Sequence, residues 1–199
     1  MKIFGIDPGS ERTGYGCVET DGSRHRIIVC GAIRTAALAS FPTKLLTIHT
    51  RLAVLLAECA PDCVAIESVF HANNVRSALK LGHARGVAML AAVEAGLPVV
   101  EYTPAEIKRA VVGHGRAEKH QVQHMVKLLL GLPAVPSPHD AADALAVAIC
   151  HVHSQAPARL AGSLPAGAAL PRTKAATSWR HYRPASALEA LRRGKPAQS

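Results

Sequence analysis

The sequence predicts an α/β domain whose mixed β-sheet is flanked by helices on both faces. Three strand-like segments open the chain, and helical and strand-like segments then alternate, which is typical of this fold class. The chain has 199 residues, a length that suits one ordinary domain. Hydrophobic residues make up 49% of it and charged residues 19%, so a buried core is available.

The first third of the chain predicts three successive strands. They cover residues 2–7, 15–20 and 26–35, and each contains a short apolar run. Asp21-Gly22-Ser23 separates the second strand from the third and is typical of a hairpin turn.

Helices and strands alternate in the rest of the domain. Apolar residues three and four positions apart predict helices over residues 43–59, 74–95 and 117–130, and short apolar runs predict strands over 63–67 and 99–102. Thr103 and Glu106 form a capping box with Pro at the first helical position, so a further helix begins there. Ser137 and Asp140 repeat that spacing and predict a last helix through about residue 153.

The composition changes after residue 154 to Pro, Ala, Gly, Ser and Arg without periodicity. We therefore expect a folded domain over residues 1–154 and a disordered basic tail over residues 155–199. The tail has eight Lys and Arg and one acid, and so carries +7 of the net charge of +9. Such a balance favours a polyanionic partner, either nucleic acid or an anionic membrane surface.

The cysteines favour a reducing compartment. They are odd in number and lie among apolar neighbours, so they do not form a disulfide framework. No apolar run reaches the roughly 20 residues of a membrane span. We expect a cytoplasmic protein without membrane attachment. The alternative to core cysteines is a zinc site drawn from Cys59, Cys63, Cys150, His151 and His153.

Four acidic residues occupy informative places. Asp7 and Glu67 each end a predicted strand, and Asp140 and Asp143 lie three residues apart on one face of the last helix. If the helix packs beside the sheet, the four carboxylates converge and repel one another, so divalent cations are needed to neutralise them. Mg²⁺ prefers such oxygen ligands. Two ions about 4 Å apart suit phosphodiester hydrolysis, since one activates water and the other stabilises the leaving oxygen.

Each acid also has a purely structural interpretation. Asp7 precedes Pro-Gly and suits an Asx turn, Asp140 suits its own capping box, and Asp143 suits the first turn of a helix because of the helix dipole. Glu67 is the hardest to explain in this way, because it follows four apolar residues.

The motifs around these acids resemble those of the RuvC family of crossover junction endonucleases. They are Phe4-Gly5-Ile6-Asp7-Pro8-Gly9, Ala65-Ile66-Glu67-Ser68-Val69-Phe70, Ser77-Ala78-Leu79-Lys80-Leu81-Gly82, Ala117-Glu118-Lys119, and Asp140-Ala141-Ala142-Asp143-Ala144-Leu145-Ala146. Together they cover residues 1–154 in the family's order.

The resemblance implies a ribonuclease-H-like fold and a homodimer that resolves four-way (Holliday) DNA junctions by paired, symmetric nicks during recombination and repair. It implies that Asp7, Glu67, Asp140 and Asp143 bind two Mg²⁺ ions per active site, with Mn²⁺ as an alternative. Some members carry His in place of the first acid of the last helix, so His139 is an open candidate for an extra ligand. Branch-migration proteins of the RuvA and RuvB type are the implied partners.

Basic residues suited to holding phosphate lie in two clusters. Arg76, Lys80 and His83 share one face of the second helix, and Lys108 and Lys119 flank the Gly113-His114-Gly115 break. Their alternative role is a solvated surface. By family position, Lys108 and Lys119 are expected near the scissile phosphate, where a cation stabilises developing charge.

Two further features of the sequence fit junction binding. Phe70 follows Glu67 by three residues and is expected to stack on an unpaired base, with core packing as the alternative. Gly82 and Gly86 permit close approach of another element, either a second subunit or the protein's own sheet.

Three other functions compete with junction resolution: a nuclease of the same fold that acts on RNA, an actin-like phosphotransferase, and a non-catalytic binder of branched DNA. A phosphotransferase needs further Gly-rich nucleotide loops, and four convergent carboxylates would hinder a simple DNA binder.

Overall fold

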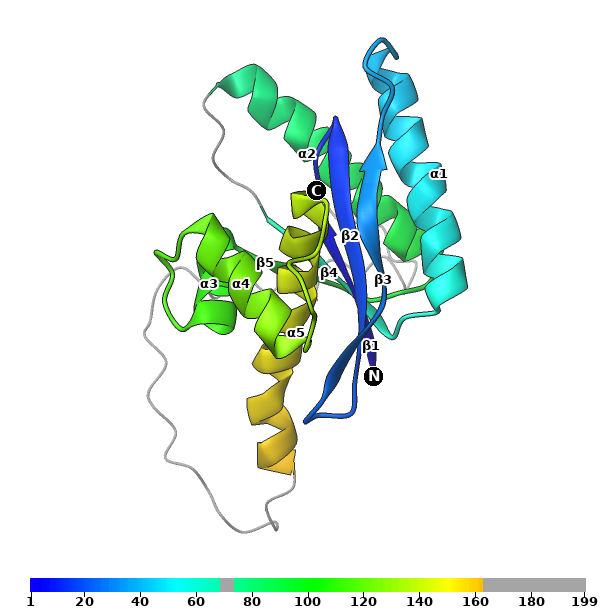
Figure 1. Ribbon diagram of the computed structural model, residues 1–199. Helices are drawn as coiled ribbons and strands as arrows, with labels where there is room; N and C mark the ends of the chain where they lie inside the picture. The colour runs from blue at the N-terminus through cyan, green and yellow to red at the C-terminus, as the bar shows by residue number, and fades with distance from the viewer. Residues whose placement is uncertain (69–73, 163–199) are drawn as a thin grey trace, which may run out of the picture. The chain divides into compact units, whose positions relative to one another are not determined.

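A five-stranded mixed sheet forms the centre of the protein in a computed structural model that describes residues 1–68 and 74–162, with side chains through residue 155 (Figure 1). The strand order is β3-β2-β1-β4-β5. β1 pairs antiparallel with β2 and parallel with β4, β2 pairs antiparallel with β3, and β4 pairs parallel with β5. The strands are β1 (Lys2–Asp7), β2 (Arg12–Thr20), β3 (His25–Arg34), β4 (Cys63–Glu67) and β5 (Val99–Tyr102).

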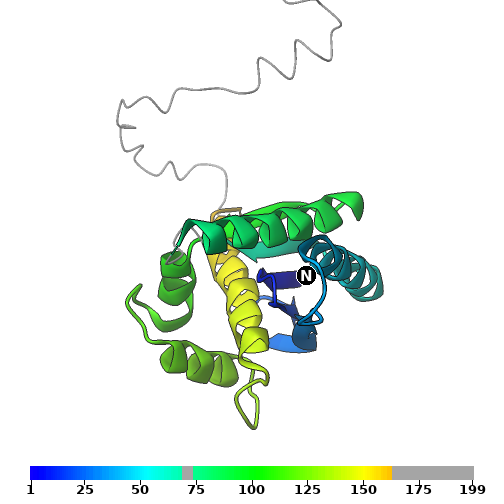
Figure 2. The ribbon, with the colours of Figure 1, turned by 90° about the horizontal axis from the view of Figure 1, so that it is seen from above.

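Helices cover both faces of the sheet, as predicted. α1 (Phe41–Cys59) and α2 (Val75–Glu94) pack on one face, where Phe4, Ile6 and Ile66 are fully buried. α5 (His139–Gly162) lies across the other face with α3 (Pro104–Val112) and α4 (Lys119–Leu129) packed against it, and Figures 1 and 2 show the two layers. The sheet therefore separates two apolar cores.

Three glycines let α5 lie directly on β1 and β2. A Cβ added at Gly5 would lie 2.1 Å from the backbone oxygen of Ala144, and one at Gly14 would lie 2.1 Å from the backbone oxygen of Asp140. At Gly16 it would lie 2.7 Å from the Leu145 side chain. Because no side chain other than hydrogen fits these contacts, the glycines fix the depth at which the first turn of α5 meets the sheet.

Most of the predicted elements are confirmed, with shifted ends. Asp21 Oδ1 accepts hydrogen bonds from the backbone N–H groups of Ser23 and Arg24 at 2.9 and 2.8 Å, which forms the predicted hairpin turn. The Thr103–Glu106 capping box is present. β2 begins at Arg12 rather than Tyr15, because antiparallel pairing with β1 and β3 extends to Arg12, Thr13 and Gly14, which show no apolar run.

The last helix differs from the prediction at both ends. It begins at His139, so Ser137 lies outside it, and Asp140 Oδ2 lies 4.0 Å from Arg12 Nη1. It continues to Gly162 instead of ending near residue 153, so Pro157 lies within the helix. Along the stretches described, no helix combines the length and the apolar character that crossing a bilayer requires.

All five cysteines are free thiols, as expected. Cys63 Sγ lies 3.3 Å from His151 Nε2, and the hydroxyl of Tyr102 lies 2.8 Å from His151 Nδ1. Within residues 1–68 and 74–155, no three His, Cys, Asp or Glu side chains are arranged to hold a metal ion.

Candidate active site

A cavity of about 340 Å³ lies at the ends of the two central parallel strands. Asp7 ends β1 and Glu67 ends β4, and the pairing of Ile6 with Ile66 places the two carboxylates at one edge of the sheet. The cavity is lined by Asp7, Glu67, Pro104, Ile107, Lys108, Lys119, Val122, Asp143 and Ala146. The structure therefore brings three of the four predicted acids and both predicted lysines into one pocket.

The carboxyl groups of Asp7 and Glu67 lie close enough together in this pocket for each to shift the pKa of the other. Burial raises the pKa of Asp7 far above its usual value, and the negative charges of Glu67 and Asp143 raise it further. Burial also raises the pKa of Glu67. Each of the two carboxyl groups therefore ionises less readily than a free one, because adjacent buried carboxylates repel each other without a compensating cation.

Asp143 is paired with Lys119 on the opposite wall. Lys119 Nζ donates a hydrogen bond to Asp143 Oδ2 at 2.6 Å. Partial burial alone would lower the pKa of Lys119, but this hydrogen bond and the charges of Asp143, Asp7 and Asp140 outweigh it, so the pKa is raised. The lysine is therefore a fixed positive charge within the acidic pocket.

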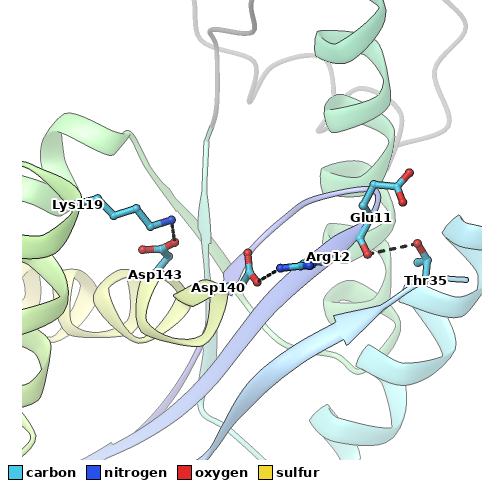
Figure 3. A network of polar contacts seen from close by, with 6 residues as sticks. All are labelled: Glu11, Arg12, Thr35, Lys119, Asp140 and Asp143. Atoms are coloured by element: carbon cyan, nitrogen blue, oxygen red, sulfur yellow. Dashed lines mark hydrogen bonds and ion pairs between the residues drawn. The ribbon is translucent and has the colours of Figure 1, made fainter. Parts of the chain in front are cut away.

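Asp140 lies at the rim of the pocket and does not line it. It is one helical turn before Asp143, its side chain is 25% exposed, and the guanidinium of Arg12 lies 4.0 Å away. Figure 3 shows Lys119, Asp143, Asp140 and Arg12 in a row, with the two cations at the ends.

The donor set fits divalent cations that prefer oxygen. Burial and mutual repulsion raise the pKa values of two carboxylates of the cluster, Asp7 and Glu67. The other two have basic partners, Asp143 in Lys119 and Asp140 in Arg12. A metal ion would replace these partners, and as the side chains stand no three described acids are already arranged around one point. Buried, mutually repelling oxygen ligands are the kind of site that Mg²⁺ and Mn²⁺ occupy.

Comparison with known proteins assigns the family. The sequence model described as crossover junction endodeoxyribonuclease RuvC matches residues 3–151. The chain belongs to this family. The RuvC protein of Trichlorobacter lovleyi is 54% identical over 184 residues, which are 92% of this chain and all of that protein. The RuvC protein of Pelobacter propionicus is 52% identical over the same shares of the two chains.

Solved structures agree with this assignment. Thermus thermophilus RuvC in complex with Holliday junction substrate superposes with a TM-score of 0.76 at 36% identity, over 79% of this chain and 96% of that one. The yeast mitochondrial Holliday junction resolvase Ydc2 has a TM-score of 0.57 at 14% identity, which supports the fold alone. The predicted family, ribonuclease-H-like fold and crossover junction endonuclease activity are thus confirmed, and the phosphotransferase and the non-catalytic binder are excluded.

The other predicted site residues that the structure describes do not line the pocket. Arg76 and Lys80 are exposed on the first turns of α2, and Lys80 Nζ lies 6.0 Å from the centre of the Phe41 ring. His83 Nδ1 lies 2.6 Å from the backbone oxygen of Leu79. Phe70 lies outside the described residues. His139 is exposed at the start of α5 and does not line the pocket.

Sequence reasoning missed the residues that brace the turn between β1 and β2. Thr35 Oγ1 donates a hydrogen bond to the backbone oxygen of Ser10 at 3.0 Å, and the buried Lys44 donates one to Glu11 Oε1 at 2.6 Å. The hydroxyl of Thr13 donates to the backbone oxygen of Gly9 at 2.8 Å. These bonds hold the segment that joins Asp7 to Arg12. No local pattern reveals the bonds of Thr35 and Lys44, because their partners lie 25 and 33 residues away along the chain.

Proposed function

We propose that this nuclease resolves four-way DNA junctions through Asp7, Glu67, Asp140 and Asp143, which together bind two Mg²⁺ ions. The observation that carries the proposal is the single pocket that contains Asp7, Glu67, Asp143, Lys108 and Lys119, with Asp140 at its rim. When bound, the two ions supply an activated water for attack on phosphorus and stabilise the oxygen that leaves as the P–O bond breaks.

The protein side chains orient the reacting groups. The mutually repelling carboxylates of Asp7 and Glu67 would be neutralised by bound cations, which would also take the place of Lys119 at Asp143. Lys119 and Lys108 then face the scissile phosphate from the α3–α4 side of the pocket. There they stabilise the negative charge that develops during displacement, an effect that is typically worth 10²–10³ in rate per group.

More distant DNA contacts are proposed on α2. The exposure of Arg76 and Lys80 supports phosphate binding, because nothing described neutralises either side chain through an ion pair. The proposal that Phe70 stacks on an unpaired base rests on its place in the sequence just after Glu67.

A homodimer is proposed through α2. Val75, Leu79, Leu90 and Val93 are 51–77% exposed and lie on one helical face. Gly82 and Gly86 lie on the same face, and a Cβ at either position would meet open space, so these glycines do not pack on the protein's own sheet. A second copy would bury this stripe and provide the second active site that paired nicks require.

The domain division also stays a proposal. All residues that line the pocket lie between Asp7 and Ala146, which supports a nuclease domain over residues 1–154 and a separate role for the basic tail over residues 155–199. Action in the cytoplasm and contacts with RuvA-type and RuvB-type branch-migration proteins are proposed from the family alone.

The test uses a mobile four-way junction, a linear duplex and an RNA duplex, each incubated with protein with and without Mg²⁺. We expect ligatable paired nicks only in the junction and only with Mg²⁺. Asp7→Asn serves as the matched control, because it should bind the junction without cutting it. Equal cutting of linear DNA or of RNA would contradict the proposal.

A further inference from the structure

Two arginines meet at the outer end of β2 and β3. Arg12 and Arg34 are directly opposite each other in the strand register, and both are exposed. Gly14 and Gly16 contact α5, and Arg12 lies on the same face of β2 because side chains two residues apart share a face. Arg34 is paired with Arg12, so both arginines lie on the face of the sheet that carries α5. Arg12 reaches toward the first turn of that helix, at Asp140.

This pair does not stabilise the fold. Like charges directly opposite each other on neighbouring strands are destabilising. Arg12 has one ion-pair partner among the described residues, Asp140 at 4.0 Å, and Arg34 has none among them. Glu11 is next in sequence, but it faces α1 and is bound to Lys44, so it does not neutralise Arg12.

The pair is continuous with the active pocket. Lys119, Asp143, Asp140 and Arg12 follow one another across the site in Figure 3. Lys108 and Lys119 thus provide positive charge on one side of the carboxylates, and Arg12 and Arg34 provide it on the other side. A DNA strand whose scissile phosphate lies in the pocket has phosphates on both sides of that position.

Hydrogen bonds hold the backbone that leads into Arg12. Thr35, the residue after Arg34, donates its hydroxyl to the backbone oxygen of Ser10 at 3.0 Å and its backbone N–H to that of Glu11 at 3.2 Å. These bonds join the end of β3 to the turn that precedes Arg12, and Figure 3 shows a further contact between them, from the Thr35 hydroxyl to the backbone oxygen of Glu11 at 3.4 Å. Because the backbone is already ordered, only the side chain of Arg12 loses conformational freedom when it binds phosphate.

We propose that Arg12 and Arg34 bind phosphates of the cleaved DNA strand next to the scissile phosphate, on the side of the pocket opposite Lys108 and Lys119. They are positioning residues for the strand. This inference rests on the proposed junction-cleaving function and adds a second phosphate-binding surface to it.

The test measures junction affinity in EDTA as a function of salt concentration for Arg12→Gln, Arg34→Gln and the double variant. The logarithm of the binding constant falls as the logarithm of the salt concentration rises. Each lost phosphate contact should make this slope less steep by about 0.7–0.9. Arg51→Gln is the matched control, because Arg51 is exposed on α1, on the other face of the sheet, and should leave the slope unchanged. Equal slopes for the wild type and the double variant would overturn the inference.

A second measurement separates phosphate binding from an effect on Asp140. In an Asp140→Asn background, Arg12→Gln should still weaken junction binding. Single phosphates near the cut are then replaced by neutral methylphosphonates. At one or two positions on one side of the cut, the replacement should abolish the effect of Arg12→Gln, that is, the difference in affinity between the proteins with and without this substitution. Loss of the Arg12→Gln effect in this background would show that Arg12 acts only through Asp140. If the wild type itself neither bound nor cut junctions, the proposed function would fail instead, so the two failures are distinguishable.

Discussion

Lys119 Nζ lies 2.6 Å from Asp143 Oδ2, so a basic side chain contacts a carboxylate that is also a proposed metal ligand. Lys119 competes with a metal ion for Asp143, and so weakens metal binding. Its positive charge also attracts the phosphate of DNA, and so favours catalysis. Metal binding and catalysis should therefore respond to this residue in opposite directions.

Lys119→Met should bind divalent cations about fivefold more tightly in the absence of DNA, since an exposed ion pair contributes up to about 1 kcal/mol. The same variant should cleave junctions about 10²–10³-fold more slowly because it lacks the cation near the phosphate. Calorimetric titration with Mn²⁺ measures the first effect and single-turnover cleavage the second. Lys127→Met on the same helix is the control, and weaker metal binding by Lys119→Met would contradict the account.

Asp7→Asn should retain junction binding within a few-fold and lose cleavage. The amide preserves the shape of the side chain but is a poor ligand for Mg²⁺. Binding is measured by electrophoretic shift in EDTA and cleavage by product analysis with Mg²⁺. A variant that keeps its thermal stability but does not bind the junction would place Asp7 in DNA recognition.

The same variant should change how stability depends on pH. The folded-state pKa of Asp7 is raised above the ordinary value of 3.8, so above about pH 4 the folded state binds more protons than the unfolded state. The free energy of unfolding therefore falls as the pH rises through this range. Metal-free Asp7→Asn should be more stable than the wild type at pH 8, by on the order of 1 kcal/mol or more, and about equally stable near pH 4. Thermal unfolding in EDTA tests this, and a wild type that gains stability relative to the variant toward pH 8 would contradict it.

Gly14→Ala should displace α5, because the new Cβ would lie 2.1 Å from the backbone oxygen of Asp140. We expect a loss of about 1–3 kcal/mol in stability and a larger loss of cleavage than of junction binding. Gly115→Ala is the control, since its nearest contact would be an ordinary 3.4 Å. Equal activity of the two variants, measured on the same junction, would show that the depth of α5 does not set the site.

Leu79→Glu should dissociate the proposed dimer, since it puts a charge within the apolar stripe of α2 where Leu79 is 59% exposed. Sedimentation should show at least a tenfold weaker association (~1.4 kcal/mol), and paired nicks should become independent single nicks. Leu46→Glu is the control, because Leu46 is 65% exposed on α1. An unchanged dimer would require a different interface.

The sequence predicts the strand-end acids well for a simple physical reason. Parallel neighbouring strands end at one edge of the sheet, so apolar runs that finish in Asp7 and Glu67 imply adjacent carboxylates. The spacing of Asp140 and Asp143 likewise fixes their shared helical face. Which strands pair, however, depends on contacts between distant segments, and no local pattern reveals them.

Contacts between distant segments explain what sequence reasoning missed. Gly5, Gly14 and Gly16 matter because of the carbonyl or side chain that faces each one, and this follows only from the position of α5. Arg12 looks like an ordinary turn residue until Asp140 is placed beside it. The start of β2 lacks an apolar run because each of its residues has a different role. Arg12 is exposed, the hydroxyl of Thr13 bonds to the backbone oxygen of Gly9, and Gly14 leaves room for the backbone of α5.

The most direct test of the metal site is a crystal structure of the protein with Mn²⁺, in which anomalous scattering locates the ions. We expect two anomalous peaks about 4 Å apart, which mark two ions bound by carboxylates of Asp7, Glu67, Asp140 or Asp143. Lys119 should have moved away from Asp143. Ions bound elsewhere while Lys119 remained paired with Asp143 would contradict it.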